Sequence, residues 1–208
     1  MKRQELAHNS SSQNFCSRTS CLLINFCSFV CHSRPYTYFH IIFSGHCEFD
    51  ISILLDSSLS IDPFYRTTGL HPNWDLVKEM AKLLIDVIDA ASTLGQTSRV
   101  QIIPFSTYSN PRVHIEDNEG KEAIKQKIDD FEYQYSNTEI SNALRKANES
   151  LVRNSRTVAG QIQVPQCVIL FTDGQPDQPN KTEAMLKSLM DRGVYVTIIG
   201  KYMYLQRS

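Results

Sequence analysis

One run of the chain places oxygen-bearing side chains at alternate positions directly after an apolar segment. Residues 51–55 read Ile-Ser-Ile-Leu-Leu, and Asp56, Ser58 and Ser60 follow them. A short apolar run bounded by polar residues is typical of a buried parallel strand, and ligands bind outside the carboxyl ends of such strands. Carboxylate and hydroxyl oxygens are hard donors, which small divalent cations prefer. The pattern therefore indicates a candidate metal site, with an ordinary Ser-rich turn as the alternative.

Two later segments strengthen the hypothesis of a metal site. Residues 168–171, Val-Ile-Leu-Phe, form a second apolar run that also ends in an aspartate, through Thr172, Asp173 and Gly174. Thr138 stands just before a segment in which apolar residues recur at helical spacing. The apolar residues of that segment are Ile140, Ala143, Leu144, Ala147 and Leu151.

Together, the three segments resemble the von Willebrand factor A domain. The resemblance rests on the Asp-x-Ser-x-Ser run, on Thr138 six residues before Leu144, and on the Phe-Thr-Asp-Gly run that ends at Gly174. In that family these segments, in this order, build a metal-ion-dependent adhesion site. The resemblance covers about residues 48–200. It implies five metal ligands: Asp56, Ser58, Ser60, Thr138 and Asp173.

The implied cation is Mg²⁺ or Mn²⁺, bound by three neutral hydroxyls and by two carboxylates that act directly or through water. Such a cation keeps positive charge toward solvent, and its open coordination position favours a Glu or Asp side chain of a partner protein. The chain departs from the family just before Thr138, where the family usually has small glycines and this sequence has Tyr135, Ser136 and Asn137.

Strands that alternate with helices require a parallel sheet with helices on both faces. We therefore expect an α/β, doubly wound, Rossmann-like fold with a mostly parallel sheet. Residues 108–115 contain Pro111, and in the resembled family this position holds one antiparallel edge strand. Asn73 and Asn180 are the expected N-caps of two helices. The expected strands cover 50–55, 99–105, 108–115, 166–172 and 194–200, and the expected helices cover 73–93, 120–131, 139–154 and 180–192.

The N-terminal segment is expected to lie outside the domain, and the domain is expected to lack its last elements. Residues 1–46 are interpreted as a leader or a disordered, non-domain segment, and their Cys and His spacing matches no paired zinc pattern. Residues 47–208 form the expected domain, without the last strand and helix of the resembled family. Cys47 is a candidate for a disulfide, and Cys167 is expected to be a small buried hydrophobe.

Composition excludes several classes of partner. The chain has 208 residues and a net charge of −1, and no basic run marks a nucleic-acid surface. No apolar stretch reaches about 18 residues, so no transmembrane segment is expected.

The favoured function is divalent-metal-dependent protein binding of the cell-adhesion type, and we expect no enzyme. The aspartyl-phosphate phosphatases are the enzyme alternative, but they need a second Asp where this chain has Ser58, and His71 and His114 have no evident carboxylate partner. The other alternative is an intracellular scaffold domain of the same fold. The complete Asp-x-Ser-x-Ser run and Cys47 resemble the secreted or cell-surface branch, which includes the thrombospondin-related adhesins of parasites.

Overall fold

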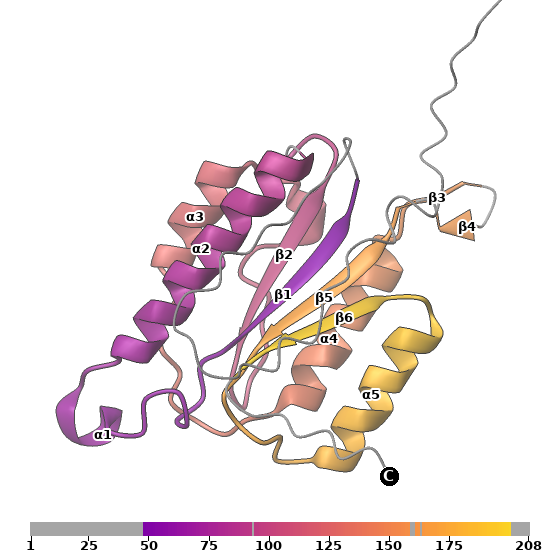
Figure 1. The fold of residues 1–208 in the computed structure, drawn as a ribbon. Helices are drawn as coiled ribbons and strands as arrows, with labels where there is room; N and C mark the ends of the chain where they lie inside the picture. The colour runs from indigo at the N-terminus through magenta and orange to yellow at the C-terminus, as the bar shows by residue number, and fades with distance from the viewer. Residues whose placement is uncertain (1–47, 93, 159–160, 163, 201–208) are drawn as a thin grey trace, which may run out of the picture. The chain divides into compact units, whose positions relative to one another are not determined.

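Four parallel strands form the sheet that carries the candidate site (Figure 1). The computed structural model describes residues 48–92, 94–158, 161–162 and 164–200. Its strand order is β2-β1-β5-β6, and all three pairings are parallel. Because β2 and β5 flank β1 on opposite sides, the strand order reverses beside β1, which is where open α/β sheets bind ligands. The strand bounds are β1 Asp50–Asp56, β2 Arg99–Phe105, β5 Gln166–Phe171 and β6 Tyr195–Ile199.

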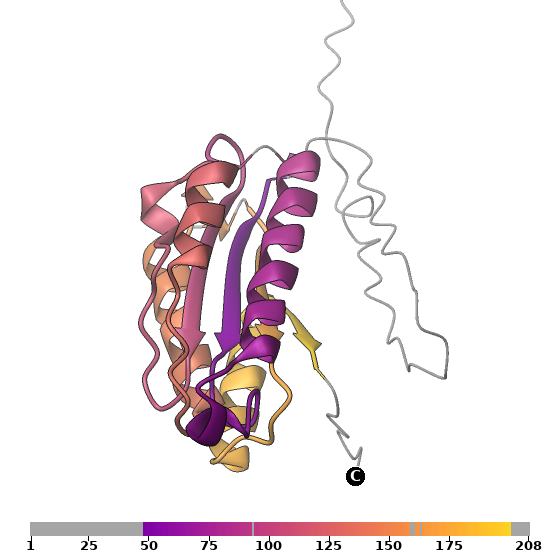
Figure 2. The same ribbon diagram turned by 90° about the vertical axis from the view of Figure 1, so that its left-hand side faces the viewer.

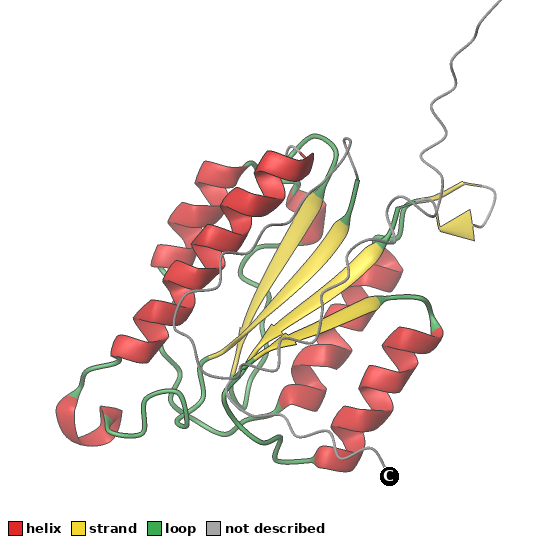
Figure 3. Cartoon of the chain, in the orientation of Figure 1, coloured by secondary structure: helices red, strands yellow, loops and turns green. Residues whose placement is uncertain are grey.

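Helices cover both faces of this sheet, as Figures 2 and 3 show. Leu54 belongs to the core cluster that holds the buried residues of α4 and Leu189 of α5. Because side chains alternate across a strand, Ile53 and Leu55 point to the opposite face of the sheet, where they are also fully buried. Trp74 of α2 is fully buried, as expected for a core residue. The doubly wound α/β prediction is confirmed. The helix bounds are α2 Pro72–Ser92, α3 Lys121–Asp129, α4 Ile140–Arg153 and α5 Pro179–Asp191.

The expected antiparallel edge strand is reduced to two isolated bridges. Val113 bridges to Ile102, and Ser109 bridges to Phe105, both antiparallel. Pro111, which lies between Ser109 and Val113, has no backbone N–H to donate, so a continuous ladder is interrupted there. The segment does run against β2 as predicted, but as bridges and not as a strand.

Both expected N-caps are wrong. Helix α2 begins at Pro72, and its first N–H groups are capped from a distance by Asp62, whose carboxylate accepts from Asn73 at 3.2 Å and from Trp74 at 2.8 Å. Helix α5 begins at Pro179, with no side-chain cap bond. Proline suits the first helical position because its missing N–H would have no partner there.

Short elements that sequence reasoning missed lie in the connections. Within the long loop after β1 is a one-turn helix, α1 (Tyr65–Thr68), closed by Gly69 in the left-handed conformation. The connection before β5 holds an antiparallel pair, β3 (Thr157–Val158) and β4 (Gln161–Ile162), and a 3₁₀ turn, η2 (Ile115–Asp117), precedes α3. No helix of the described part of the chain is long and apolar enough to cross a membrane. The leader expected for residues 1–46, Cys47 and the tail at 201–208 lie outside the described residues.

Cys167 is a free thiol in β5 and only half-buried, so the expectation of a buried residue is met in part; desolvation still raises its pKa to about 12. At pH 8.5 a free cysteine is about half ionised, whereas this thiol stays protonated. We therefore expect iodoacetamide to modify Cys167 about 100-fold more slowly in the folded chain than in concentrated urea. Peptide mapping by mass spectrometry after timed quenching measures the two rates. Equal rates would show that the folded chain does not shield this thiol.

Candidate metal centre

The candidate site lies at the carboxyl ends of the neighbouring strands β1 and β5. Leu55 of β1 pairs with Phe171 of β5, so the chain leaves both strands at the same level. Asp56 is the last residue of β1, and Asp173 stands two residues beyond β5. The fold thus brings together two aspartates that are far apart in the sequence.

Asp56 is held in place by hydrogen bonds from two segments. Its carboxylate accepts the backbone N–H of Ser58 at 2.9 Å and the hydroxyl of Thr172 at 2.6 Å. The Thr172 hydroxyl also accepts the N–H of Gly174 at 3.2 Å, which ties the turn after β5 to the same point. Asp56 therefore joins the β1 loop to the β5 loop.

The electrostatics of Asp56 favour a nearby cation. Its side chain is fully buried, and this burial raises the pKa of its carboxyl group, partly offset by the hydrogen bonds from Ser58 and Thr172. The charge of Asp173 raises this pKa further. In the part of the chain that the structure describes, no basic side chain forms an ion pair with either aspartate. Two close carboxylates, one of them desolvated and neither of them neutralised, fit a divalent cation.

The hydroxyls of Ser58 and Ser60 lie together, and that of Ser60 contacts Asp173. Their Oγ atoms lie 3.0 Å apart, and the Ser60 hydroxyl donates to the Asp173 carboxylate at 2.9 Å. Ser58 is buried, whereas Ser60 and Asp173 are exposed. The cluster thus has a buried side formed by β1 and an open side toward solvent. Among the described residues no three His, Cys, Asp or Glu side chains form a metal-binding group, so any metal centre here depends on hydroxyl donors.

Thr138 reaches the same point from the loop before α4. A methyl group placed on Gly174 would lie 3.0 Å from Oγ of Ser60 and 3.5 Å from Oγ1 of Thr138, so both hydroxyls border this glycine. Asp177 secures Thr138 from the β5–α5 loop. Its carboxylate accepts the Thr138 N–H at 2.9 Å, and its own N–H donates to the Thr138 carbonyl at 3.2 Å. All five predicted ligands therefore belong to one cluster.

The segment that departs from the family pattern is held by backbone pairing. The Tyr135 N–H donates to the Ser57 carbonyl at 2.9 Å, and the Leu59 N–H donates to the Ser136 carbonyl at 2.9 Å. Tyr135 has φ +40°, a left-handed conformation that glycine adopts more easily. These contacts keep the loop beside the Asp-x-Ser-x-Ser run, although a tyrosine takes the strained position.

Tyr133 holds the backbone of the Asp-x-Ser-x-Ser run by a hydrogen bond. Its buried hydroxyl donates to the Ser58 carbonyl at 2.7 Å and accepts the Asp62 N–H at 3.1 Å, and burial raises its pKa to about 12. We expect Tyr133→Phe to lower the free energy of unfolding by about 1–3 kcal/mol, because two buried backbone groups lose their partner. Urea unfolding followed by circular dichroism measures the loss. The matched control is Tyr108→Phe, at a side chain that is 73% exposed, and an equal effect at both positions would contradict this role of Tyr133.

Gly200, which has no side chain, lies directly against the backbone of Thr172. The Thr172 N–H donates to the Ile199 carbonyl at 3.0 Å, and a methyl group on Gly200 would lie 1.7 Å from the Thr172 carbonyl oxygen. Any larger residue there must move Thr172, and with it the hydroxyl that holds Asp56. The sequence showed only a glycine at a strand end and gave no sign of this contact.

Sequence reasoning missed the supporting residues Thr172, Asp177 and Tyr133. Thr172 had a usable signal, since it stands inside the Phe-Thr-Asp-Gly run. The expectation that His71 has no carboxylate partner is wrong: its Nδ1 lies 3.2 Å from Asp75, in a pair on the exposed side of α2.

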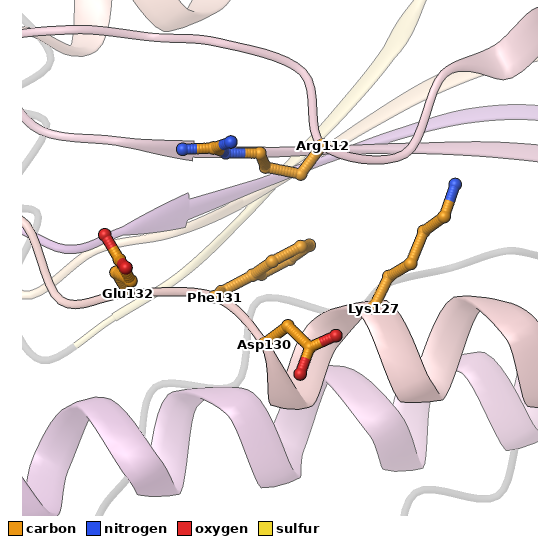
Figure 4. A pocket seen from close by; sticks show the side chains of 5 residues that line it. All are labelled: Arg112, Lys127, Asp130, Phe131 and Glu132. Carbon is orange, nitrogen blue, oxygen red and sulfur yellow. The ribbon is translucent and has the colours of Figure 1, made fainter.

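A separate pocket of about 400 Å³ contains none of the predicted ligands (Figure 4). It has side chains of both charges around Phe131, and Lys127 is already bonded to Glu119. The pocket is lined by Arg112, Lys127, Asp130, Phe131 and Glu132.

Comparison with known proteins identifies the family. The family model for the von Willebrand factor type A domain matches residues 50–205, which is most of the chain. The chain therefore belongs to this family, and the predicted resemblance is confirmed.

The relatives to which the chain is similar are much longer proteins. It is 26% identical over 158 residues to "Thrombospondin-related anonymous protein" of Plasmodium berghei (strain Anka), which covers 74% of this chain and 24% of that protein. It is 26% identical over 151 residues to the collagen alpha-4(VI) chain of Mus musculus, which covers 73% of this chain and 6% of that one. The chain thus spans a quarter or less of the length of these relatives.

A solved structure confirms the fold. Manganese-loaded TRAP protein of Plasmodium vivax superposes with a TM-score of 0.58 at 22% identity, covering 74% of this chain and 57% of that one.

Proposed function

We propose that this chain is a divalent-metal-dependent protein-binding module of the adhesion type, with Mg²⁺ or Mn²⁺ bound by Asp56, Ser58, Ser60, Thr138 and Asp173. The observation that carries the proposal is that these oxygen donors lie together around two carboxylates, neither of which forms an ion pair with a basic side chain in the described part of the chain. Membership of the von Willebrand factor A family and the manganese of the Plasmodium vivax protein support the same kind of ion.

The donor set determines what the bound ion would do. Ser58, Ser60 and Thr138 contribute neutral oxygens, so they leave the charge of a divalent cation largely uncompensated. Asp56 is buried and Asp173 exposed, which places the open side of the cluster toward solvent. Mg²⁺ keeps several of its waters in proteins, and a water on this open side is exchangeable for a carboxylate. We infer that the partner protein supplies a Glu or Asp side chain at that position.

A binding role fits the site better than catalysis. The cluster has carboxylates and hydroxyls, but the residue two positions after Asp56 is Ser58, where an aspartyl-phosphate enzyme needs its acid–base group. The His71–Asp75 pair lies on the surface of α2, outside the cluster. We propose a non-enzymatic module, secreted or at the cell surface, as the thrombospondin-related and collagen relatives favour.

Two measurements on the full chain test this function. Calorimetric titration with MgCl₂ and with MnCl₂ is expected to show one equivalent of metal bound. With Mn²⁺ bound, water-proton relaxation is expected to fall when acetate displaces a metal-bound water, and acetamide, which has no charge, is the control. A folded chain that binds neither metal would exclude the adhesion function and leave a scaffold domain. Metal binding without any effect of acetate would exclude the carboxylate mechanism alone.

A further inference from the structure

The chain contains a short sequence pattern that the proposed metal centre does not use. Asn-x-Ser or Asn-x-Thr is the acceptor of N-linked glycans in secreted proteins, and it occurs here at Asn148 and at Asn180. A third match, at Asn9, lies outside the described residues. Because so short a pattern also arises by chance, the surroundings of each asparagine in the fold have to distinguish an acceptor from a coincidence.

The side chain of Asn180 is open to solvent, whereas that of Asn148 takes part in the fold. Asn180 is the second residue of α5, is exposed, and has a side chain that forms no hydrogen bond with another described residue. Asn148 is half-buried in the middle of α4, and its Oδ1 accepts a hydrogen bond from the guanidinium of Arg192, just after α5. A bulky, hydrated glycan is therefore accommodated at Asn180, but at Asn148 it would disturb a contact between two helices.

The hydroxyl of Thr182, which completes the pattern at Asn180, forms no hydrogen bond in the described part of the fold. Thr182 is 4% exposed, and its Oγ1 has no partner among the described residues. A buried hydroxyl without a partner is unfavourable, and a valine of similar shape would avoid that cost. The acceptor pattern, by contrast, requires a hydroxyl two residues after its asparagine. The pattern thus accounts for a threonine that packing alone does not.

The burial of Thr182 also determines when a glycan is added. The donor is an oligosaccharide that a polyprenyl lipid carries through a diphosphate. A bond forms between Nδ2 of Asn180 and C1 of the first sugar, the bond from C1 to the diphosphate oxygen breaks, the lipid diphosphate leaves, and Nδ2 gives up one proton. Since the transferring enzyme has to reach both residues of the pattern, the transfer precedes the folding step that buries Thr182.

A glycan on Asn180 would lie at the end of the sheet that carries the metal centre. Helix α5 begins at the end toward which the strand arrows point (Figure 1). The Cα–Cβ bonds of a helix tilt toward its N-terminus, so a glycan in the first turn points past the start of α5. Asp177, whose carboxylate accepts the Thr138 N–H at 2.9 Å, is three residues before Asn180, so their Cα atoms are at most about 11 Å apart.

We propose that Asn180, and not Asn148, carries an N-linked glycan, and that this glycan stands beside the metal centre on the side of the β5–α5 loop. The proposal rests on the secreted or cell-surface setting of the proposed function. A small ion passes such a glycan, so metal affinity is unchanged. A partner protein has to approach the centre from the side of the β1 loop.

Peptide mapping tests the modification in the full chain, secreted from mammalian cells with an added signal sequence. Glycan release by peptide N-glycosidase in H₂¹⁸O turns a glycosylated asparagine into an aspartate that carries ¹⁸O, which mass spectrometry locates. We expect the label at Asn180 in most copies and none at Asn148. Asn180→Gln and Thr182→Val are expected to lose it, whereas Thr182→Ser, which keeps a hydroxyl, retains it. An unlabelled Asn180, or a label at Asn148, would overturn the proposal.

Urea unfolding of the unglycosylated chain tests whether the fold needs the hydroxyl of Thr182. Thr182→Val is expected to unfold at the same urea concentration as the wild type or a higher one. The control is Ser57→Ala, which removes a buried hydroxyl that donates to the Phe105 carbonyl at 2.9 Å and is expected to lower the midpoint. A clearly lower midpoint for Thr182→Val would show that packing accounts for this threonine and would remove the support it gives to the proposal.

Proton NMR with Mn²⁺ tests the position of the glycan. After the glycan is trimmed to its first sugar, the N-acetyl methyl signal is expected to broaden with Mn²⁺ and to stay sharp with Mg²⁺. A sugar signal that stays sharp while the Gly174 amide broadens would overturn the position beside the centre. A chain that binds no Mn²⁺ would instead overturn the proposed function, and peptide mapping would still decide the modification.

Discussion

Asp173→Ala and Ser58→Ala are each expected to weaken Mn²⁺ binding by about 100-fold, since even residues that only support metal ligands contribute about 10–100-fold. The Asp173→Ala substitution removes one of the two carboxylate charges of the proposed metal site. The Ser58→Ala substitution removes a hydroxyl oxygen that lies 3.0 Å from the hydroxyl oxygen of Ser60. Calorimetric titration of each variant beside the wild-type chain measures the change.

Two controls separate ligand loss from loss of fold. Asp191→Ala removes the same charge from an exposed position in α5 and is expected to leave the Mn²⁺ affinity unchanged. Circular dichroism of Asp173→Ala is expected to match the wild type, because Asp173 is exposed and its side chain supports no core contact. Wild-type affinity in both Asp173→Ala and Ser58→Ala would show that the metal binds elsewhere.

Asp50→Ala is expected to lower the free energy of unfolding by about 3–5 kcal/mol, the usual effect of removing one partner from a buried ion pair. The Asp50 carboxylate is fully buried at the start of β1, where Arg99 contacts both of its oxygens, at 2.9 and 2.8 Å. Arg156 donates to the same carboxylate at 2.8 Å. Without Asp50, the partly buried Arg99 loses the carboxylate that it pairs with, and Arg156 keeps only its ion pair with Glu48 at 3.2 Å. Urea unfolding at constant ionic strength measures the change.

The matched control for Asp50 is a surface ion pair. Asp75→Ala breaks contacts with Lys78 at 3.4 Å and with His71, and is expected to change the free energy of unfolding by no more than about 1 kcal/mol. Because Asp50 lies at the end of β1 opposite to Asp56, Mn²⁺ affinity is expected to persist while Asp50→Ala remains folded. Equal losses of stability in both variants would mean that the buried pair contributes no more than a surface pair.

The parallel strands and the main helices were predictable from the sequence because each follows a local pattern. The apolar runs around Ile53 and Ile169 mark buried strands, and the spacing of Ile140, Leu144 and Leu151 marks a helix. The boundaries were less predictable, since they depend on distant contacts. Asp62 caps α2 from the preceding loop, a contact across 12 residues that no local capping pattern contains.

The members of the candidate site were predictable, but their supports were not. Asp56, Thr138 and Asp173 stand in runs whose order along the chain resembles one family. By contrast, Tyr133 binds the Ser58 carbonyl across 75 residues and Gly200 lies against the Thr172 carbonyl, contacts that arise only when the sheet assembles. Residue type alone gives no sign of such contacts.

The most direct test of the metal centre is residue-by-residue NMR broadening of the ¹⁵N-labelled full chain by substoichiometric Mn²⁺. The paramagnetic ion broadens amide signals steeply with proximity, so it locates the bound metal without any substitution. The account predicts that the amides of Ser58, Ser60, Thr138 and Gly174 broaden first, and that excess Mg²⁺ restores them. Broadening centred on another acidic group, such as Asp130 and Glu132, or uniform weak broadening, would contradict the account.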